Sequence, residues 1–235
     1  MKPLERKICI ITGAFGTLGA ATARGLSGAG ARIALLDRAP KAPPGLTAAC
    51  GPGAIEIGGV DLTDAAEAAR AFDTVRRQLA EPQVLVNIAG MFRWQPLTAG
   101  GVEIWDALFE ANLKTAVIST REALGLMARS TGGRIINIGA HAALRAGAGM
   151  GPYTASKSAV HRFTESLAEE LKETGITVNA ILPSIIDTPA NRADMPQADF
   201  SKWVTPEALA EVIVFLASDA SQAITGALIP VTGRV

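Results

Sequence analysis

Short apolar runs alternate along the chain with longer segments whose apolar positions repeat with a helical period. The short runs are rich in Ile and Val and are apolar throughout, which is typical of strands buried on both faces of a parallel sheet. The segments between them have the period of helices that cover such a sheet. The predicted strands are residues 7–12, 32–37, 54–59, 84–88, 134–138, 176–182 and 227–231.

The last predicted helix illustrates the helical pattern. Leu209, Ile213 and Leu216 fall on one face of it. Thr205 is a suitable N-cap, and Pro206 suits the first turn. The same reasoning predicts helices over residues 17–27, 64–78, 102–127, 153–173 and 206–217.

The alternation of strand and helix predicts the fold class. Short connections between alternating elements favour an α/β architecture with a doubly wound, Rossmann-like parallel sheet of about seven strands. We expect a single domain over residues 1–235. The link over residues 38–53 contains four prolines and is expected to be mostly loop.

Composition excludes several classes of function. Lys plus Arg and Asp plus Glu each number 22, so charge gives no reason to expect nucleic acid or a membrane as a partner. No apolar run approaches the roughly 18 residues of a membrane-spanning helix, and the first residues lack the apolar core of a signal peptide. Cys9 and Cys50 are expected to be reduced thiols in a cytoplasmic protein. Two histidines give no basis for a metal centre.

A glycine-rich turn follows the first predicted strand. Gly13, Gly16 and Gly19 would allow tight curvature and a close approach of the backbone to a pyrophosphate at the N-terminus of the next helix. The second strand ends in Asp37, whose carboxylate can accept hydrogen bonds from an adenine ribose and would repel a 2′-phosphate. NAD(H) is therefore favoured over NADP(H), although Arg38 beside it would partly offset the repulsion.

Two further strand ends carry polar or small residues. Ligands bind at the carboxyl ends of strands in open α/β sheets, so these residues are candidates for cofactor contact. Asp61 has an alternative role as a helix cap together with Asp64. The candidates are Asp61, Leu62, Asn87, Ala89 and Gly90.

Tyr153 and Lys157 are four residues apart and share one face of a predicted helix. A free tyrosine has a pKa near 10 and is a poor acid–base catalyst at neutral pH. A neighbouring ammonium favours the phenolate, so we expect Lys157 to lower the pKa of Tyr153. The pair is therefore predicted to carry proton transfer.

These motifs together resemble the short-chain dehydrogenase/reductase family over nearly the whole chain. The resemblance implies that Tyr153 exchanges a proton with the substrate, that Lys157 binds the nicotinamide ribose and that Asn112 supports a relay water. It also implies that the Ile186 backbone holds the carboxamide and that Thr188 reaches the pyrophosphate. The expected cofactor contacts are Gly13, Phe15, Gly16, Thr17, Leu18, Gly19, Asp37, Arg38, Asp61, Leu62, Asn87, Ala89, Gly90, Tyr153, Lys157, Pro183, Ile186 and Thr188.

The sequence departs from the family pattern at two places. The glycine pattern of the family is usually Gly-x-x-x-Gly-x-Gly, whereas this chain has Gly13-x-x-Gly16-x-x-Gly19. The difference is compatible with binding but changes which backbone amide would meet the phosphate. The serine that polarises the substrate carbonyl in the family is replaced by Ala140. Loss of one such donor typically costs on the order of 10²–10³ in rate. Either the enzyme tolerates this loss, or its substrate does not need the serine.

A subset of the family, the quinonoid dihydropteridine reductases, also lacks this serine, and residues 182–203 resemble them. The acceptor of that subset takes hydride into a conjugated ring. The first expected function is therefore NADH-dependent reduction of a conjugated, pteridine-like compound. The alternatives are a carbonyl reductase or alcohol dehydrogenase, including the 3-oxoacyl type, that tolerates Ala140, and a dinucleotide-binding protein without catalysis.

The substrate space is expected near the carboxyl edge of the sheet and a lid that follows the sixth strand. Trp94 is expected either to stack on a flat heterocycle or to pack the lid. The candidate substrate residues are Met91, Phe92, Trp94, Ala140, Leu144, Met150, Asn191, Arg192 and Trp203. From the resemblance we also expect a homodimer or homotetramer, formed through the helices predicted over residues 102–127 and 153–173.

Overall fold

The computed structural model describes residues 2–127 and 132–235. Seven parallel strands form one sheet in the order β3-β2-β1-β4-β5-β6-β7, which confirms the predicted doubly wound α/β class. The strands are β1 (Ile8–Thr12), β2 (Arg32–Leu36), β3 (Ile55–Ile57), β4 (Val84–Asn87), β5 (Gly133–Ile138), β6 (Ile176–Pro183) and β7 (Leu228–Val231).

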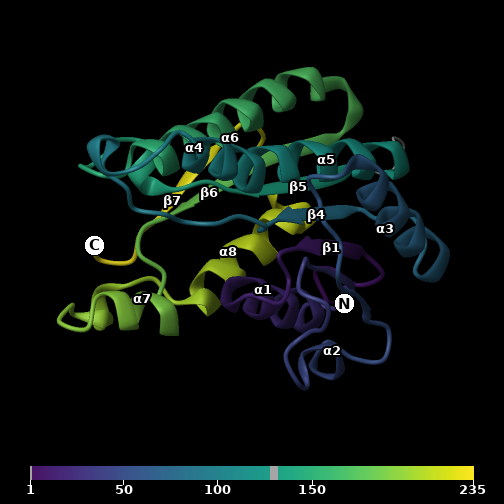
Figure 1. Ribbon diagram of the computed structural model, residues 1–235. Helices are drawn as coiled ribbons and strands as arrows, with labels where there is room; N and C mark the ends of the chain where they lie inside the picture. The colour runs from purple at the N-terminus through teal and green to yellow at the C-terminus, as the bar shows by residue number, and fades with distance from the viewer. Residues whose placement is uncertain (1, 128–131) are drawn as a thin grey trace.

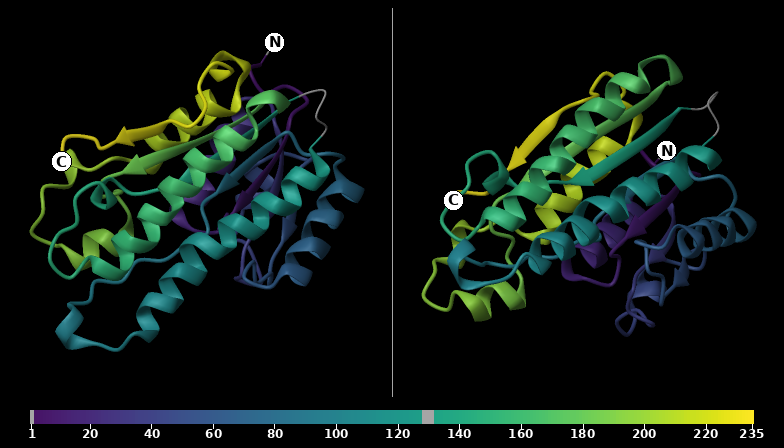
Figure 2. Two further views of the ribbon diagram at one scale, coloured as in Figure 1. Left: turned by 90° about the horizontal axis from the view of Figure 1, so that it is seen from above. Right: turned by 45° about the horizontal axis from the view of Figure 1, so that its top comes forward.

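Helices cover both faces of the sheet (Figures 1 and 2). One layer contains α1 and α8, and the other contains α3, α5 and α6, with α4 leading into α5. The α-helices are α1 (Thr17–Gly28), α2 (Leu46–Ala49), α3 (Ala65–Gln78), α4 (Glu103–Phe109), α5 (Thr115–Leu126), α6 (Gly151–Glu170), α7 (Pro189–Asp194) and α8 (Pro206–Ala217).

The continuous apolar character of the strands explains the two layers. Along β1, Cys9 and Ile11 pack with α1 and α8, whereas Ile8 and Ile10 pack with α3, α5 and α6. Successive side chains of a strand point to opposite faces, so an all-apolar strand supplies two cores at once. Burial of such side chains contributes about 25 cal/mol per Å² of apolar area and is the main stabilising effect in the fold.

The chain reverses its direction of travel across the sheet between β1 and β4. It runs outward from β1 to β3 and then returns to β4 on the other side of β1. A crevice opens at such a switch point, outside the carboxyl ends of the two strands. Thr12 ties these ends together, because its hydroxyl accepts hydrogen bonds from the N–H groups of Ile88 (3.1 Å) and Ala89 (3.2 Å).

The helix predicted over residues 102–127 differs from the observed structure. It is divided into α4, a π-helical segment (Glu110–Lys114) and α5. A π segment holds one extra residue per turn and often marks a functional site. Here it carries Asn112, whose side-chain oxygen accepts a hydrogen bond from the N–H of Met91. The widened turn thus brings a helix side chain to the loop that follows β4.

Two short helices were not predicted. α2 interrupts the predicted loop over residues 38–53, and α7 follows β6. α7 has six residues, too few to show a helical period, and it begins with the Thr188 hydroxyl accepting from the Asn191 N–H. The predicted cap of α8 is confirmed, since the Thr205 hydroxyl accepts from the Ala208 N–H. No helix within residues 2–127 and 132–235 is long and apolar enough to cross a membrane.

Candidate active site

The glycines of the turn after β1 have different structural roles. Gly13 has φ +64°, and a Cβ on it would lie 2.7 Å from the Ala89 nitrogen. A Cβ on Gly19 would lie 2.2 Å from the Gly13 carbonyl oxygen. Around Gly16 the closest heavy atom would be 3.6 Å away. Gly13 and Gly19 are therefore required by packing of the protein itself, whereas Gly16 leaves space that faces the cavity.

Gly16 also caps α1 without any side-chain hydrogen bond to the first turn. The first N–H groups of a helix lack intrahelical partners and carry a partial positive charge. Thr17 and Leu18 follow Gly16 and line the same cavity. This helix N-terminus suits a pyrophosphate, as the sequence predicted.

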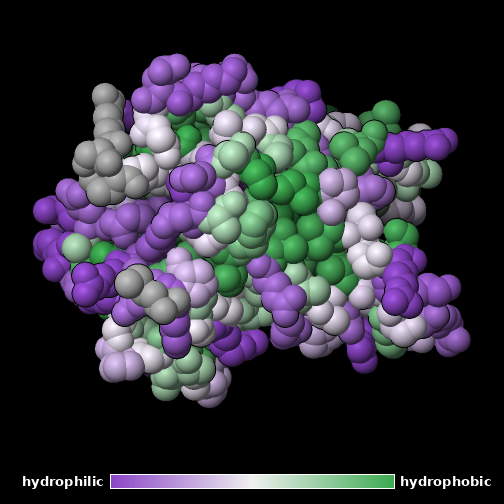
Figure 3. Space-filling model, turned by 180° about the vertical axis from the view of Figure 1, so that it is seen from behind, coloured by the Kyte–Doolittle hydropathy of each residue, from purple (hydrophilic) through white to green (hydrophobic). Residues whose placement is uncertain are grey.

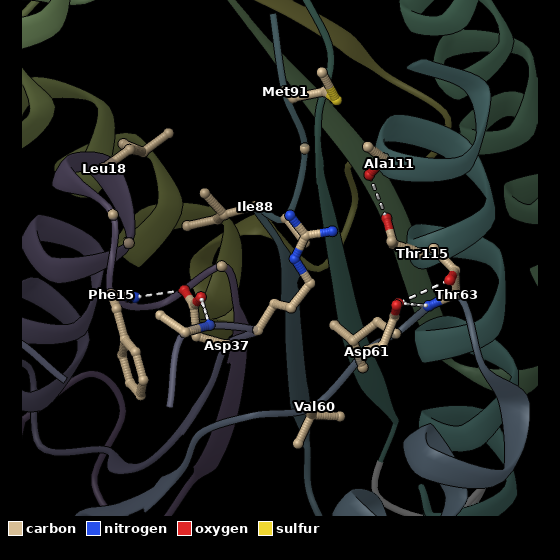
Figure 4. A pocket seen from close by; sticks show the side chains of 18 of the residues that line it. Phe15, Leu18, Asp37, Val60, Asp61, Thr63, Ile88, Met91, Ala111 and Thr115 are labelled. Carbon is tan, nitrogen blue, oxygen red and sulfur yellow. Dashed lines mark hydrogen bonds between the residues drawn. The ribbon is translucent and has the colours of Figure 1, made fainter. Parts of the chain in front are cut away.

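Asp37 lies just after β2 and faces the glycine turn (Figure 4). Its two carboxylate oxygens accept from the N–H groups of Phe15 and Ala39, each at 2.9 Å. A carboxylate has lone pairs for further hydrogen bonds, so ribose hydroxyls can still be accepted. The two backbone contacts fix the orientation of the carboxylate before any ligand binds.

Asp61 lies across the cavity from Asp37 (Figure 4). The hydroxyl and N–H of Thr63 both donate to its side chain, and these hydrogen bonds hold the pKa of Asp61 below its usual value. The cap of α3 is Asp64, which accepts from the N–H groups of Ala66 and Glu67. Asp61 is thus not the cap of this helix, and it is free to face a ligand.

A cavity of about 750 Å³ connects these groups, a size within the range of small-molecule and cofactor sites. The N-terminus of α1 lies at one end of the cavity, and the Asp37 carboxylate lies beyond it. The first suits the pyrophosphate of a dinucleotide, and the second suits its ribose hydroxyls. Of the predicted cofactor residues, those that line the cavity are Gly13, Phe15, Gly16, Thr17, Leu18, Gly19, Asp37, Arg38, Asp61, Leu62, Ala89, Gly90 and Thr188. Lining residues not predicted are Ala39, Val60, Thr63, Ile88, Ala107, Glu110, Ala111, Thr115 and Ala190, and Met91 was predicted only for the substrate.

Five predicted cofactor residues do not line the cavity. Two of them, Tyr153 and Lys157, lie on α6, and the other three lie elsewhere. The Asn87 amide points into the protein interior, where it donates to Thr120 (3.1 Å) and Asn137 (2.9 Å). Pro183 is buried at the end of β6. The Ile186 carbonyl accepts from the side chain of Asn191 at 2.8 Å. Cofactor contacts of these three residues remain predictions.

Gly90 joins the cavity to the catalytic candidates. A Cβ at this position would lie 2.5 Å from the Asn112 side-chain oxygen and 3.6 Å from Lys157 Nζ. Asn112 is buried and accepts from the Met91 N–H at 2.8 Å while donating to the Ser156 hydroxyl at 2.9 Å. The π segment, the loop after β4 and α6 therefore meet at one point.

Tyr153 and Lys157 lie on α6 as predicted, but their protonation differs from the expectation. Burial raises the pKa of Tyr153 to about 12 and lowers the pKa of Lys157 to about 8. Burial therefore outweighs the lowering of the Tyr153 pKa that was expected from Lys157. The reason is geometric, since Lys157 Nζ donates to the carbonyl of Ile138 at 2.8 Å and both groups have lost water. At neutral pH, Tyr153 keeps its proton.

Ala140, which stands where the family has a serine, is buried next to α6. Its side chain has no polar atom, and its N–H donates to Nε2 of His161 at 3.2 Å. His161 was not among the predicted site residues. A single histidine on a helix has no sequence signal that separates a buried structural role from a functional one.

The candidate substrate residues fall into two groups. Phe92, Trp94 and Leu144 are exposed, and the Phe92 ring meets the Tyr153 ring edge-on with centroids 4.9 Å apart. The Trp94 indole N–H donates to the Ala148 carbonyl, and Met150 caps α6.

The other group forms the lid after β6. Arg192 forms a two-point ion pair with Asp187 (2.6 and 2.7 Å) and lies over the Phe200 ring. Trp203 packs on Phe200 and is only 6% exposed. The side chain of Asn191 turns back to the Ile186 carbonyl. The lid is thus held together by its own side chains.

Comparison with known proteins identifies the family. A profile described as short chain dehydrogenase matches residues 7–199. The chain belongs to the short-chain dehydrogenase family. Two relatives are a 3-oxoacyl-acyl-carrier-protein reductase of Thermotoga maritima (31% identical, 98% of both chains) and a D-threitol dehydrogenase of Mycolicibacterium smegmatis (32% identical, 98% of this chain and 93% of the relative). A short-chain dehydrogenase/reductase structure from Serratia marcescens is 28% identical, with a TM-score of 0.90 over 99% of this chain and 98% of that one.

Family membership makes the protein an NAD(P)-dependent oxidoreductase. In a short-chain dehydrogenase the cofactor carries the redox chemistry, and the protein supplies position, charge and protons. The cavity and the residues grouped around Tyr153 fit this division. The cavity lies at the switch point, and Gly90 and Met91 border both the cavity and the catalytic candidates.

Proposed function

We propose that this short-chain dehydrogenase is an NADH-dependent reductase of a conjugated, planar acceptor similar to a quinonoid dihydropteridine. The observation that carries the proposal is Ala140. An isolated carbonyl develops negative charge on its oxygen during reduction and benefits from a second hydroxyl donor. A conjugated ring spreads the incoming electron pair, so it does not depend on such a donor.

The neighbouring hydroxyls support this interpretation, because each already has a backbone partner. Thr154 donates to the Met150 carbonyl at 2.8 Å, and Ser156 donates to the Tyr153 carbonyl at 2.8 Å. Ser158 donates to the Ala143 carbonyl at 3.2 Å. Each of these three hydroxyls would have to give up its hydrogen bond to a backbone carbonyl in order to replace the missing serine.

Aromatic side chains beside Tyr153 support a planar acceptor. Phe92 is 47% exposed although it contacts the tyrosine ring, and Trp94 is 60% exposed on the same loop. Exposed aromatic side chains that lie close together can provide an apolar surface for a ligand. Stacking or edge contacts with a flat ring would remove their surface from water.

Asp37 supports a preference for NADH. Its carboxylate is fixed toward the cavity by two backbone hydrogen bonds. A 2′-phosphate at this position would bring two negative charges together, whereas ribose hydroxyls can donate to the carboxylate. Arg38 also lines the cavity, so the preference is expected to be clear but not absolute.

The residues of the chain have distinct parts in the proposed reaction. When bound, the nicotinamide supplies the hydride. The turn after β1 and the N-terminus of α1 hold the pyrophosphate, and Gly90 allows the chain to pass close to the cofactor. Tyr153 keeps its proton at neutral pH and donates it from the phenol oxygen to the reduced substrate. The Lys157 ammonium supplies positive charge at the same face of α6.

A second candidate is a carbonyl reductase that tolerates Ala140. It is favoured by the names of relatives at 30–32% identity, several of which are 3-oxoacyl-acyl-carrier-protein reductases. Such an enzyme would use the same Tyr153 and Lys157. The two candidates differ only in the acceptor that receives the hydride.

The test is the loss of NADH absorbance with quinonoid dihydropterin generated in situ, alongside a panel of ketones, aldehydes and 3-oxoacyl thioesters. We expect turnover with the pterin and slow turnover with carbonyls. The Ala140→Ser variant should leave pterin turnover within a few-fold of wild type. Turnover of carbonyls alone, with a clear gain on Ala140→Ser substitution, would contradict the proposal and support the carbonyl reductase.

We also propose that the protein forms a homodimer or homotetramer. Phe109 of α4 and Val117 of α5 are exposed on the helices predicted to pair. Figure 3 shows a second apolar area on the back of the molecule, the side on which β7 lies. Leu228 and Ile229 are partly exposed on the edge strand β7, and Phe215 of α8 is 44% exposed. Sedimentation of a monomer at micromolar concentration would contradict this prediction.

A further inference from the structure

His161 shares a helix face with the two residues assigned to the chemistry. Tyr153, Lys157 and His161 follow one another at intervals of four residues along α6. The His161 side chain is only 2% exposed, and nothing in the proposed reaction uses it. Its imidazole accepts a hydrogen bond from the N–H of Ala140, the position where the chain departs from its family.

Two consecutive peptide groups at the end of β5 are held by α6. The peptide between Ile138 and Gly139 accepts from Lys157 Nζ at 2.8 Å and donates to the Ile181 carbonyl at 2.9 Å. The next peptide donates from Ala140 to His161 Nε2 at 3.2 Å. Peptide groups are planar and rigid, and these two share the Cα atom of Gly139. The torsions at Gly139 are soft, so the two groups turn independently unless both are bonded, and the bonds to Ile181 and His161 together fix the end of β5.

The imidazole and Gly139 are matched in shape. A Cβ at position 139 would lie 2.5 Å from Nε2 and 2.7 Å from Cδ2 of His161. Glycine is thus needed for the ring to reach the backbone. A side chain that merely filled space would not require such a close approach.

The protonation of His161 suits the role of an acceptor. Burial, helped by the charges of Arg162 and Lys157, lowers the pKa of His161 to about 4. The ring is therefore neutral at physiological pH. Because Nε2 accepts the Ala140 N–H, the ring proton must be on Nδ1.

We propose that His161 is a positioning residue: by accepting the Ala140 N–H it fixes the end of β5, so that the Ile138 carbonyl holds Lys157 on the Tyr153 face of α6. This inference rests on the proposed roles of Tyr153 and Lys157. It assigns to the histidine the alignment of the catalytic pair rather than contact with the substrate.

The first test uses the protein without cofactor. Nitrogen-15 NMR of the imidazole should show the Nδ1–H tautomer of His161 at pH 7, and the Nε2–H tautomer would overturn the proposal. The pKa of Lys157, followed with labelled lysine, should stay near 8 in His161→Gln, whose amide oxygen can replace Nε2. In His161→Leu it should fall, because the carbonyl that stabilises the ammonium is no longer held. An unchanged pKa in folded His161→Leu would also overturn the proposal.

The second test uses turnover with NADH and the best acceptor. We expect kcat of His161→Leu to fall about tenfold, as expected when a group that aligns a catalytic residue is lost, while His161→Gln recovers most of it. The alkaline limb of the pH profile should move to lower pH in His161→Leu only. Equal impairment of the Gln and Leu variants would indicate a packing role and overturn the proposal.

Thr164→Val provides the matched control. Thr164 lies three residues further along α6, is fully buried and accepts from the side chain of Asn137 at 2.9 Å. Its loss should lower the melting temperature without moving the alkaline limb. A wild-type protein inactive with every acceptor, or an active Tyr153→Phe variant, would remove the proposed function instead. The tautomer and the Lys157 pKa would still decide the role of His161.

Discussion

The two halves of the candidate active site, a proposed cofactor half and a proposed catalytic half, are built in different ways. The cofactor half, around the turn after β1, faces its cavity with backbone N–H groups and glycines, and its carboxylates are oriented by backbone hydrogen bonds. The catalytic half, around α6, contains side chains that are buried and bonded to one another or to the end of β5. Substitutions that add side-chain volume should therefore impair the cofactor half. Substitutions that remove a hydrogen bond or alter a charge should impair the catalytic half.

The largest expected effect is the loss of the acid in the catalytic half. Tyr153→Phe should reduce kcat about 10³-fold, because general acid catalysis by a positioned side chain contributes this much. The affinity for NADH, measured by fluorescence titration, should stay within about twofold of wild type, since the cavity does not include the phenol. A variant with wild-type kcat would contradict the assignment of Tyr153.

Alanine substitutions at two glycines of the cofactor half should affect stability and NADH binding separately. Gly19→Ala should destabilise the protein by roughly 3 kcal/mol or more, because its Cβ meets the Gly13 carbonyl. Gly16→Ala should leave the free energy of unfolding nearly unchanged and weaken NADH binding about tenfold, since its Cβ enters the cavity. Urea unfolding and NADH titration of both variants measure the difference. Equal binding by Gly16→Ala and wild type would contradict the placement of the pyrophosphate.

In the catalytic half, His161 should make the free energy of unfolding decrease in acid. The pKa of His161 is about 4 in the folded protein and near 6.5 when unfolded, so the unfolded chain takes up the proton first as the pH falls. The stabilisation is present above pH 6.5 and is lost as the pH falls toward 4. It amounts to roughly 2–3 kcal/mol between pH 7 and 4.5. His161→Gln should lack this part of the pH dependence in urea unfolding, and identical curves for both proteins would refute a buried neutral histidine.

The smallest effect is expected at Arg192 in the lid, because this residue does not line the cavity, although Thr188 and Ala190 of the same segment do. Arg192→Ala removes an ion pair whose arginine is half exposed, so the free energy of unfolding should stay nearly unchanged. KM for the acceptor should rise at most about fivefold, which corresponds to about 1 kcal/mol. Lys202→Ala, which removes the weaker Lys202–Asp199 pair of the same lid, is the control and should change neither quantity. A larger effect on kcat than on KM would show that the lid aligns the reacting groups.

Most residues predicted for the cofactor half line one cavity, because their sequence signals are local. A glycine turn between strand and helix and a carboxylate after the next strand fix their own positions once the strands are known. Gly13, Asp37 and Asp61 accordingly line one cavity. Asn87 shows the limit of this reasoning, since the side-chain direction at a strand end depends on the partners it meets across the sheet.

The catalytic half could be predicted only in part, because its contacts join distant segments. The spacing of Tyr153 and Lys157 showed a shared helix face but could not show that Ile138 holds the ammonium. The π segment depends on the contact between Asn112 and Met91 across the loop after β4. Nothing in the sequence indicated a role for His161, because that role depends on a hydrogen bond from the N–H of Ala140, 21 residues earlier in the chain.

The two loops predicted to border the substrate space are joined by hydrogen bonds. The Gln95 N–H donates to the Gly149 carbonyl at 2.8 Å, and the Trp94 indole donates to the Ala148 carbonyl. A Cβ at position 149 would lie 2.3 Å from the indole ring of Trp94. For enzyme engineering, residues 91–96 and 144–150 therefore form one structural unit. Substitutions in one loop alone would disrupt its hydrogen bonds to the other loop. A new substrate range therefore requires that both loops be exchanged together.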